Sequence, residues 1–378
     1  YAQTDWYIYQ QQCPLYNAPG LPISWNKNQY KEGTNEYVAV RPELKKQIEE
    51  LYRKHPEEAR DSFGEDPFEV KNILKYWVFS EKPEFHVIPT DTINIHIDKD
   101  ALLRSGIMLP KTIRHLKGED LKDAIPDKLY IPLTDIRMLT KVDLLMLEML
   151  ANCNWERPLY LAISVGSVSK LKFDNYFVQE GLAFRFTPFD YKKWGDVGEN
   201  RLYAVDVERL YDNVMNRYKY GGLDTPGLYL DETTLRTCWY HRRLFAQLAK
   251  ELIAQGDNER AKKVLAYAEQ VIPGYNVPET HESGSYDIAT AYAALGEKTK
   301  AVTLAVHLIA EAEDYINWAF SLKGNRIEMV RNDCIYKFWQ WNQYNELLKK
   351  IDGEKYKESN WQFEEKYALF APTMNYKN

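Results

Sequence analysis

Glu180 is the best single candidate in this chain for acid–base chemistry. It lies beside Gly181 at the entrance to a predicted strand, and Arg185 follows within that strand. A glycoside hydrolase needs a second carboxyl group from another part of the fold, which sequence spacing cannot identify. The alternative is an ion pair that fixes the turn. We therefore assign no catalytic residue.

A second set of polar residues lies in the run Asn154-Trp-Glu-Arg-Pro-Leu-Tyr160. The run precedes a predicted strand, whereas ligands of open parallel sheets usually bind at the carboxyl ends of strands. A structural role is the simpler interpretation, in which Arg157 donates to main-chain carbonyls and Trp155 fills a junction between helix and strand. The candidate binding residues are Trp155, Arg157, Tyr160, Glu180 and Arg185.

The motifs that the sequence lacks argue against several kinds of site. Its seven histidines include no HExxH pair and its four cysteines no CxxC pair, so we expect no metal site. GxSxG, Walker A and GxGxxG motifs are also missing, and we expect no cofactor. The net charge of −6 and the interspersed charges argue against nucleic acid as a partner.

Residues 140–188 organise the first predicted domain. Apolar residues at 142, 145, 146, 149 and 150 predict a one-sided helix over 140–153. The apolar run at 159–165 predicts a buried strand, and residues 182–186 predict a second strand that stops at Pro188. A helix, a strand, a connector and a strand are the core of an α/β layer.

The upstream sequence predicts further elements of the same domain. Ile93, Ile95 and Ile97 alternate with the polar residues Asn94, His96 and Asp98, which predicts a half-buried strand within 85–98 with the polar residues on its other face. Apolar spacing and capping residues predict helices at 4–12, 41–54 and 67–79, and strands at 21–25 and 129–133.

A change of composition at 191–200 separates this α/β (α+β) domain, residues 1–190, from an all-α domain, residues 191–378. Helices are predicted at 206–218 and 233–254. Two later helical units share a Gly turn, a polar link and an Ala that opens the next helix, at Gly256 and at Gly296. This pattern is tetratricopeptide-like, although the two turns are 40 residues apart and residues 276–285 form an inserted loop.

The aromatic content is high, with 28 tyrosines and 10 tryptophans. Such side chains either fill thick cores or form surfaces that bind carbohydrate or protein. The four scattered cysteines are expected to be buried small hydrophobic residues. No apolar window of about 18 residues occurs, so the chain contains no predicted membrane span. It begins at Tyr1 without Met or a signal peptide, which favours a fragment or a processed form.

Several runs together resemble one protein family. They are Thr4-Asp-Trp-Tyr-Ile8, Ile88-Pro-Thr90, Ile95-His-Ile-Asp-Lys99, Leu139-Thr-Lys-Val-Asp-Leu144, Asn154-Trp-Glu-Arg-Pro-Leu-Tyr160, Tyr176-Phe-Val-Gln-Glu-Gly-Leu-Ala-Phe-Arg185 and Tyr229-Leu-Asp-Glu232. From residue 1 to about residue 261, the sequence resembles the carboxyl-terminal soluble region of a bacterial family of multi-pass membrane proteins of unknown function. That family is similar to protein O-mannosyltransferases, which have the GT-C glycosyltransferase architecture.

The resemblance implies a membrane context. The chain would lie on the extracytoplasmic (periplasmic) side of the bacterial inner membrane, anchored through transmembrane segments that precede it. In GT-C enzymes the catalytic carboxylate lies in an early loop of the membrane part, so no catalytic residue is carried over. The expected partners are the membrane-embedded part of the same polypeptide and an acceptor polypeptide or glycan.

The preferred hypothesis is therefore a noncatalytic module that engages acceptor protein or glycan, or partner subunits. One alternative is a carbohydrate-active enzyme domain in its own right, with Glu180 in a cleft beside a second carboxylate. Another is a purely structural scaffold in which the aromatic residues are all buried. The exposure of Trp6, Trp25, Trp194 and Trp341 separates the binding and scaffold hypotheses.

Overall fold

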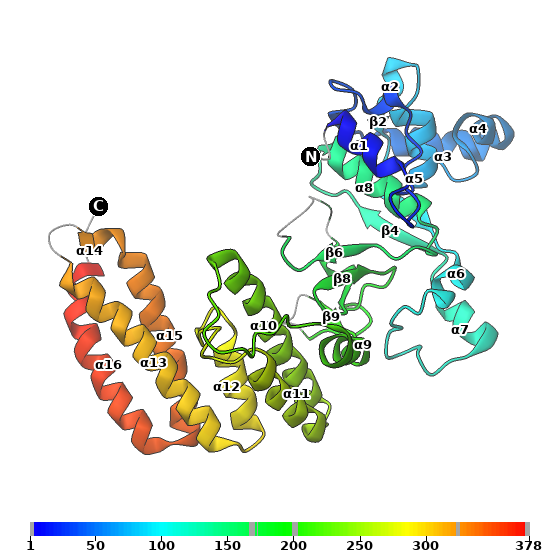
Figure 1. Cartoon of the computed structure of the whole chain (residues 1–378). Coiled ribbons are helices and arrows are strands. Elements are labelled where there is room, and N and C mark those ends of the chain that lie inside the picture. The colour runs from blue at the N-terminus through cyan, green and yellow to red at the C-terminus, as the bar shows by residue number, and fades with distance from the viewer. Residues whose placement is uncertain (1–3, 166–170, 172, 199–202, 323–325, 375–378) are drawn as a thin grey trace. The chain divides into compact units, whose positions relative to one another are not determined.

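The computed structural model describes residues 4–165, 171, 173–198, 203–322 and 326–374 (Figure 1). The chain forms two compact units. Unit 1 comprises residues 1–179 and 183–206, and unit 2 comprises residues 180–182 and 207–378. Unit 1 mixes helices with small β-sheets, and the described elements of unit 2 are helical. The boundary between the two units follows Asp206, whereas the sequence predicts a boundary after residue 190 from the change of composition at 191–200.

The helices of unit 1 are short. They are α1 (Asp5–Gln12), α2 (Lys27–Tyr30), α3 (Leu44–Lys54), α4 (Pro56–Phe63), α5 (Val70–Ile73), α6 (Lys99–Arg104), α7 (Gly118–Ala124) and α8 (Lys141–Asn152). α8 begins with a reciprocal cap, because Thr140 Oγ1 accepts from Asp143 N and Asp143 Oδ2 accepts from Thr140 N. The helix predicted at 140–153 is confirmed.

The helix predicted at 67–79 is only partly α-helical. The helix begins at Val70, three residues later than predicted, and Asp66 Oδ1 accepts from Phe68 N at 3.0 Å in the turn before it rather than capping it. After α5 the chain continues as a π-helical turn, η1 (Leu74–Val78), in which Phe79 N donates to Leu74 O at 2.9 Å. The described residues of unit 1 also form two 3-10 turns, η2 (Pro83–Phe85) and η3 (Asp174–Tyr176).

The described strands form three small sheets. Their orders are β2 (Val87–Ile88)–β1 (Tyr37–Val40)–β5 (Met138–Thr140), then β3 (Thr92–His96)–β4 (Lys128–Pro132), and β6 (Tyr160–Ala162)–β8 (Ala183–Phe186)–β7 (Phe177–Gln179)–β9 (Ala204–Val205). The β1–β2 and β7–β9 pairs are parallel, and the other pairs are antiparallel.

The alternation predicted around β3 is present, with one exception. Ile93, Ile95 and Ile97 are buried in the core of unit 1, as predicted. Asn94, predicted to face solvent, is also buried because residues 68–69 cover it and Phe68 O accepts from Asn94 N at 2.9 Å.

One strand prediction is wrong, and a second is right in its position but not in the length and burial of the strand. Residues 21–25 are irregular, and the side chain of Gln12 donates to the carbonyls of Ile23 and Trp25 in place of a β-ladder. The sequence predicts a buried strand at 159–165, but β6 is a short edge strand and Tyr160 is 49% exposed. The third sheet is mostly antiparallel, and one face of an edge strand can remain in water.

Unit 2 is built from paired helices. Its described elements are α9 (Val207–Asp212), the π-helical turn η4 (Asn213–Arg217), α10 (Glu232–Ala254), α11 (Asn258–Val271), α12 (Ser285–Ala294), α13 (Lys298–Ser321), α14 (Arg326–Met329), α15 (Arg331–Ile351) and α16 (Gly353–Met374). Both α11 and α12 pack on α10, and from α12 the chain continues with α13 on α12, α15 on α13 and α16 on α15, as Figure 1 shows from green to red.

The turns between these helices follow the predicted pattern. Gly256 has φ of 81° and Gly296 has φ of 77°, a left-handed conformation that favours glycine after a helix. Asp257 then caps α11, with Oδ1 accepting from Arg260 N at 3.1 Å. The inserted loop predicted at 276–285 lies between α11 and α12.

Candidate functional site

Two of the predicted binding residues support the main chain of unit 1. Trp155 is buried, and its Nε1 donates to the carbonyl of His96 at 2.8 Å. Nη1 of Arg157 donates to the carbonyls of Pro19 and Gly20 at 3.2 and 2.8 Å. The hydrogen bonds that the structural interpretation assigned to Arg157 are therefore present.

Arg185 has a similar environment. It is buried, and its Nη2 donates to the carbonyl and the hydroxyl of Ser105 at 2.9 and 2.8 Å, while Nη1 donates to Gly106 O at 3.4 Å. Trp155, Arg157 and Arg185 together line a gap of about 10 Å³. This volume is no larger than one water molecule requires. The three residues meet, but not around space for a substrate.

Tyr160 and Glu180 lie elsewhere. Tyr160 is opposite Arg185 in the register of β6 and β8, and its side chain is half exposed. Glu180 is 4% exposed, and its Oε1 lies 2.7 Å from Nη1 of Arg209. Asn213 Nδ2 donates to Glu180 O at 2.7 Å. An ion pair therefore fixes this turn, as the alternative interpretation predicted, and Arg209 supplies a cation that the sequence did not identify.

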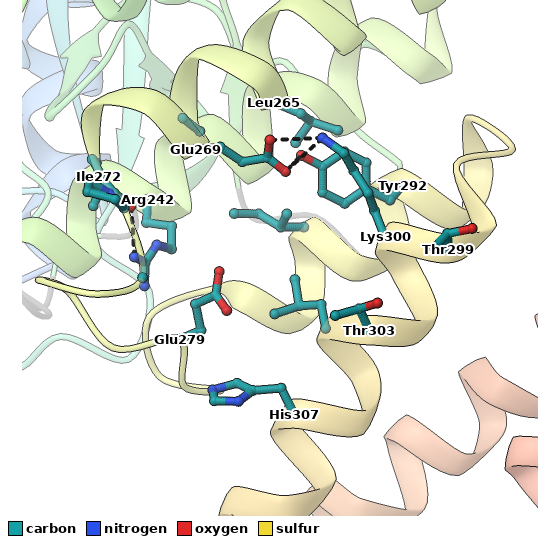
Figure 2. Close-up of a pocket in the computed structure, with 15 residues that line it drawn as sticks. Arg242, Leu265, Glu269, Ile272, Glu279, Tyr292, Thr299, Lys300, Thr303 and His307 are labelled. Carbon is teal, nitrogen blue, oxygen red and sulfur yellow. Dashed lines mark hydrogen bonds and ion pairs between the residues drawn. The ribbon is translucent and has the colours of Figure 1, made fainter. Parts of the chain in front are cut away.

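A larger cleft, with a volume of about 400 Å³, lies within unit 2 (Figure 2). Its apolar lining comprises Leu265, Ala268, Ile272, Pro273, Ile288 and Leu304. Its polar lining comprises Arg242, Glu269, Glu279, Tyr292, Thr299, Lys300, Thr303 and His307. These residues come from α10, α11, α12, α13 and the loop between α11 and α12, which brings distant parts of the chain to one cleft.

One wall of the cleft carries a closed ion pair. Lys300 Nζ lies 2.8 Å from Glu269 Oε2 and 5.0 Å from the centre of the Tyr292 ring. Tyr292 Oη donates to Glu269 Oε1 at 2.5 Å, and burial together with this bond raises the pKa of Tyr292. The two charges of this wall largely compensate each other.

Arg242 holds the loop that forms the opposite wall. Its Nη1 donates to Pro278 O at 2.8 Å and to Ser283 Oγ at 3.1 Å. Its Nη2 donates to Ile272 O at 3.0 Å and to Val277 O at 2.7 Å. Burial lowers the pKa of Arg242 to about 10, so the guanidinium remains charged at neutral pH. One buried cation thereby fixes the inserted loop through two of its main-chain carbonyls and a hydroxyl, and joins it to the end of α11 through the carbonyl of Ile272.

The remaining polar residues of the lining come from the loop between α11 and α12 and from α13. Glu279 points toward its centre in Figure 2 and makes no hydrogen bond or ion pair with another residue that the structure describes. Thr299, Thr303 and His307 are contributed by α13. The cleft thus combines a hydrogen-bond acceptor, several donors and an apolar floor, the composition of a binding site rather than of a catalytic pair.

The described residues give two further observations on the expected chemistry. They contain no group of three or more His, Cys, Asp or Glu side chains that could hold a metal ion. All four cysteines are free, and Cys153, Cys238 and Cys334 are buried, as predicted, with burial raising the pKa of each thiol. Cys13 is only partly buried.

The family model of TMEM260-associated domain 2 matches residues 1–208. The chain belongs to this family. No curated protein and no solved structure matches it. The family name connects the domain with a membrane protein, while no helix in the described part of this chain is both long and apolar enough to cross a membrane.

The TMEM260-associated domain 2 match covers unit 1 and ends at the start of α9. All five predicted binding residues therefore lie in the matched region, whereas the residues of the larger cleft follow it. The sequence predicted the helices and the inserted loop of the cleft but none of its lining side chains. Its useful signals were the Gly256 and Gly296 turns.

Proposed function

We propose that this chain is the extracytoplasmic, noncatalytic recognition module of a membrane glycosyltransferase-like protein related to protein O-mannosyltransferases. A membrane-embedded part of the same polypeptide would hold it at the periplasmic face of the bacterial inner membrane. The association of the family with a membrane protein supports the membrane context. The glycosyltransferase relation rests on the resemblance of the sequence runs described above.

The ligand that we propose for unit 2 is a segment of the acceptor polypeptide. The observation that carries this proposal is the cleft of about 400 Å³, whose lining includes the Glu279 carboxylate and the threonines Thr299 and Thr303. A peptide main chain presents both N–H and C=O groups and needs acceptors and donors together. Ile288 and Leu304 contribute apolar surface to the lining that a side chain of the peptide would cover.

The paired helices of unit 2 support the same ligand class. Helix pairs α10–α11 and α12–α13 join through left-handed glycines, and each pair packs on the next. Stacked helical repeats commonly form extended concave surfaces that bind polypeptides. The inserted loop, fixed by Arg242, closes one side of the surface.

The two alternative functions have less support. Glu180 is buried against Arg209 and lines neither the cleft of unit 2 nor the gap beside Trp155, so it is poorly placed to act as an acid in a cleft. A pure scaffold was expected to bury its aromatic residues. Trp25 and Trp341 are buried, but Trp6 is 53% exposed and Trp194 is partly buried.

Calorimetry with serine- and threonine-rich acceptor peptides, with and without mannose, tests the proposal. We expect binding to the wild-type chain and an affinity about tenfold lower for Glu279→Lys. Glu364→Lys, which makes the same charge change at an exposed site on α16, is the control. Absence of heat with every peptide would overturn the proposal, and equal binding of free mannose would replace polypeptide by glycan as the ligand.

A further inference from the structure

A second cavity, of about 350 Å³, lies in unit 1 and is separate from the cleft described above. It is lined by Gln10, Gln11, Cys13, Pro14, Leu15, Ala18, Pro19, Gly20, Leu21 and Arg157. Arg157 is the one charged residue among these ten, and no carboxylate accompanies it. The cavity therefore has a positive charge without an acidic neighbour in its lining.

The hydrogen bonds of Arg157 fix its guanidinium but do not use all of it. A guanidinium has five N–H groups, two on each Nη and one on Nε. Nη1 donates to the carbonyls of Pro19 and Gly20. Within the part of the chain that the structure describes, Nε and Nη2 have no hydrogen-bond or ion-pair partner. Three N–H groups remain for a ligand, and Nε with Nη2 form the edge that binds two oxygens at once.

The surrounding main chain holds Arg157 in place. Trp155 has φ of 60°, an uncommon conformation for a residue other than glycine, and its indole is bonded to His96 O. Gly20 lies so close to Gln12 that a Cβ at position 20 would overlap the carbonyl of Gln12. Because these restraints already fix the main chain on both sides of the cavity, less conformational entropy would be lost when a ligand binds.

The polar groups on the other side of the cavity are neutral. Gln10 and Gln11 lie in the last turn of α1 and contribute amide side chains to the lining. Their main-chain carbonyls accept from Cys13 N at 3.1 Å and from Leu21 N at 2.7 Å. These bonds involve only the main chain, and each side-chain amide carries two N–H groups that can donate to a bound oxygen.

From this geometry we infer that the cavity is an oxyanion-binding site, in which Arg157 receives a phosphate or carboxylate group through Nε and Nη2. The Nε and Nη2 donors without a partner in the described chain, the absence of an acidic lining residue and the nearby amide donors select this class over a cation or a wholly apolar ligand. The site is independent of peptide binding in unit 2. The oxyanion could belong to a soluble ligand or to a lipid headgroup, which present the same oxygens to the guanidinium.

Thermal unfolding of the full chain in inorganic phosphate, at constant ionic strength set with chloride, tests the soluble source. Sedimentation with phosphatidylglycerol vesicles, compared with phosphatidylcholine vesicles, tests the lipid source. We expect at least one arm to respond: a rise in Tm with phosphate, or preferential binding to the anionic vesicles. Either response should be reduced in Arg157→Lys and lost in Arg157→Gln.

Arg157→Gln also removes the hydrogen bonds to the carbonyls of Pro19 and Gly20, so a lost response could reflect a loss of folding. A second variant separates the two explanations. Ala18→Trp fills the cavity from an exposed position and leaves Arg157 unchanged. It should abolish the same response while the chain remains folded by circular dichroism. An unresponsive wild type in both arms, or an equal response in Ala18→Trp, would overturn the inference.

Discussion

Lys141 is fully buried in unit 1, and its Nζ lies 2.6 Å from Oε1 of Glu36. The same nitrogen donates to the carbonyls of Tyr30 and Lys31, both at 3.3 Å. The ammonium thus has a partner for each of its three N–H groups. It joins the first residue of α8 to the segment before β1, two parts of the chain about 100 residues apart in sequence.

Removing the Glu36 side chain should therefore lower the free energy of unfolding more than removing the charge of Lys141. Glu36→Ala leaves a buried ammonium without its anion, and we expect a loss of about 3 kcal/mol in the free energy of unfolding. Lys141→Met leaves a carboxylate that is 33% exposed and can be hydrated, so we expect a loss of about 1 kcal/mol. Urea denaturation followed by tryptophan fluorescence measures both. Equal losses, or the reverse order, would show that the buried ammonium of Lys141 does not need the Glu36 carboxylate to compensate its burial.

Ser359 joins α15 to α16 through a buried chain of hydrogen bonds. Trp341 Nε1 donates to Ser359 Oγ at 2.8 Å, and Ser359 Oγ donates to Asn345 Oδ1 at 2.6 Å. Ser359→Ala removes the hydroxyl and leaves Trp341 Nε1 and Asn345 Oδ1 without this partner. We therefore expect unit 2 to lose about 1–3 kcal/mol of stability. Lys357→Ala, at an exposed position of α16, should change stability by less than about 0.5 kcal/mol. Similar denaturation midpoints for the two variants would contradict this.

His241 should make unit 2 less stable in acid. Burial lowers the pKa of His241 below its ordinary value of 6.5, and the ring contacts Tyr218 and Tyr220 edge-on. Since the unfolded chain binds the proton more readily, the stability from neutral His241 is complete above about pH 6.5 and is lost as pH falls through the lowered pKa.

We expect His241→Phe, which keeps a ring in this contact, to reduce the fall in Tm between about pH 7.5 and about pH 5. The exposed His307→Gln substitution should leave that fall unchanged. The measurement is thermal unfolding by circular dichroism across this pH range. An unchanged pH dependence in His241→Phe would assign the acid sensitivity to other groups.

Gly181 and Tyr218 should show strong energetic coupling. A Cβ at Gly181 would overlap Tyr218 Oη, the same oxygen that accepts from Leu182 N at 3.0 Å. Gly181→Ala should therefore destabilise the chain by about 1–3 kcal/mol. Tyr218→Phe removes the overlapping oxygen, so Gly181→Ala should cost less in the Tyr218→Phe background. A double-mutant cycle measures this coupling, and additive effects would disprove the steric explanation.

Local sequence signals predicted the helices well because a helix is specified within a few neighbouring residues. Apolar spacing located α8, and the glycines at 256 and 296 located the turns of unit 2. Strand predictions failed more often because the pairing of a strand depends on residues far away in the sequence. β6 has three residues and its exposure depends on its place at the edge of a sheet, and the side chain of Gln12 replaces the ladder predicted at 21–25.

The side-chain geometry was less predictable. The donors of Arg157 suggested carbonyl partners, but only the fold shows that these are Pro19 and Gly20 and that a cavity lies beside them. Glu180 takes its cation from Arg209, in a different predicted domain. The cleft of unit 2 joins Glu279 from a loop to Thr303 from α13, a proximity that no local spacing encodes.

Site-specific photo-crosslinking gives the most direct test of peptide recognition in unit 2. A benzophenone amino acid would replace Thr303 inside the cleft or Lys357 on the exposed face of α16. An acceptor peptide should crosslink from position 303 and not from position 357, and Glu279→Lys should reduce the yield. Equal yields from the two positions, or no crosslink from position 303 to a peptide that binds, would contradict recognition in this cleft.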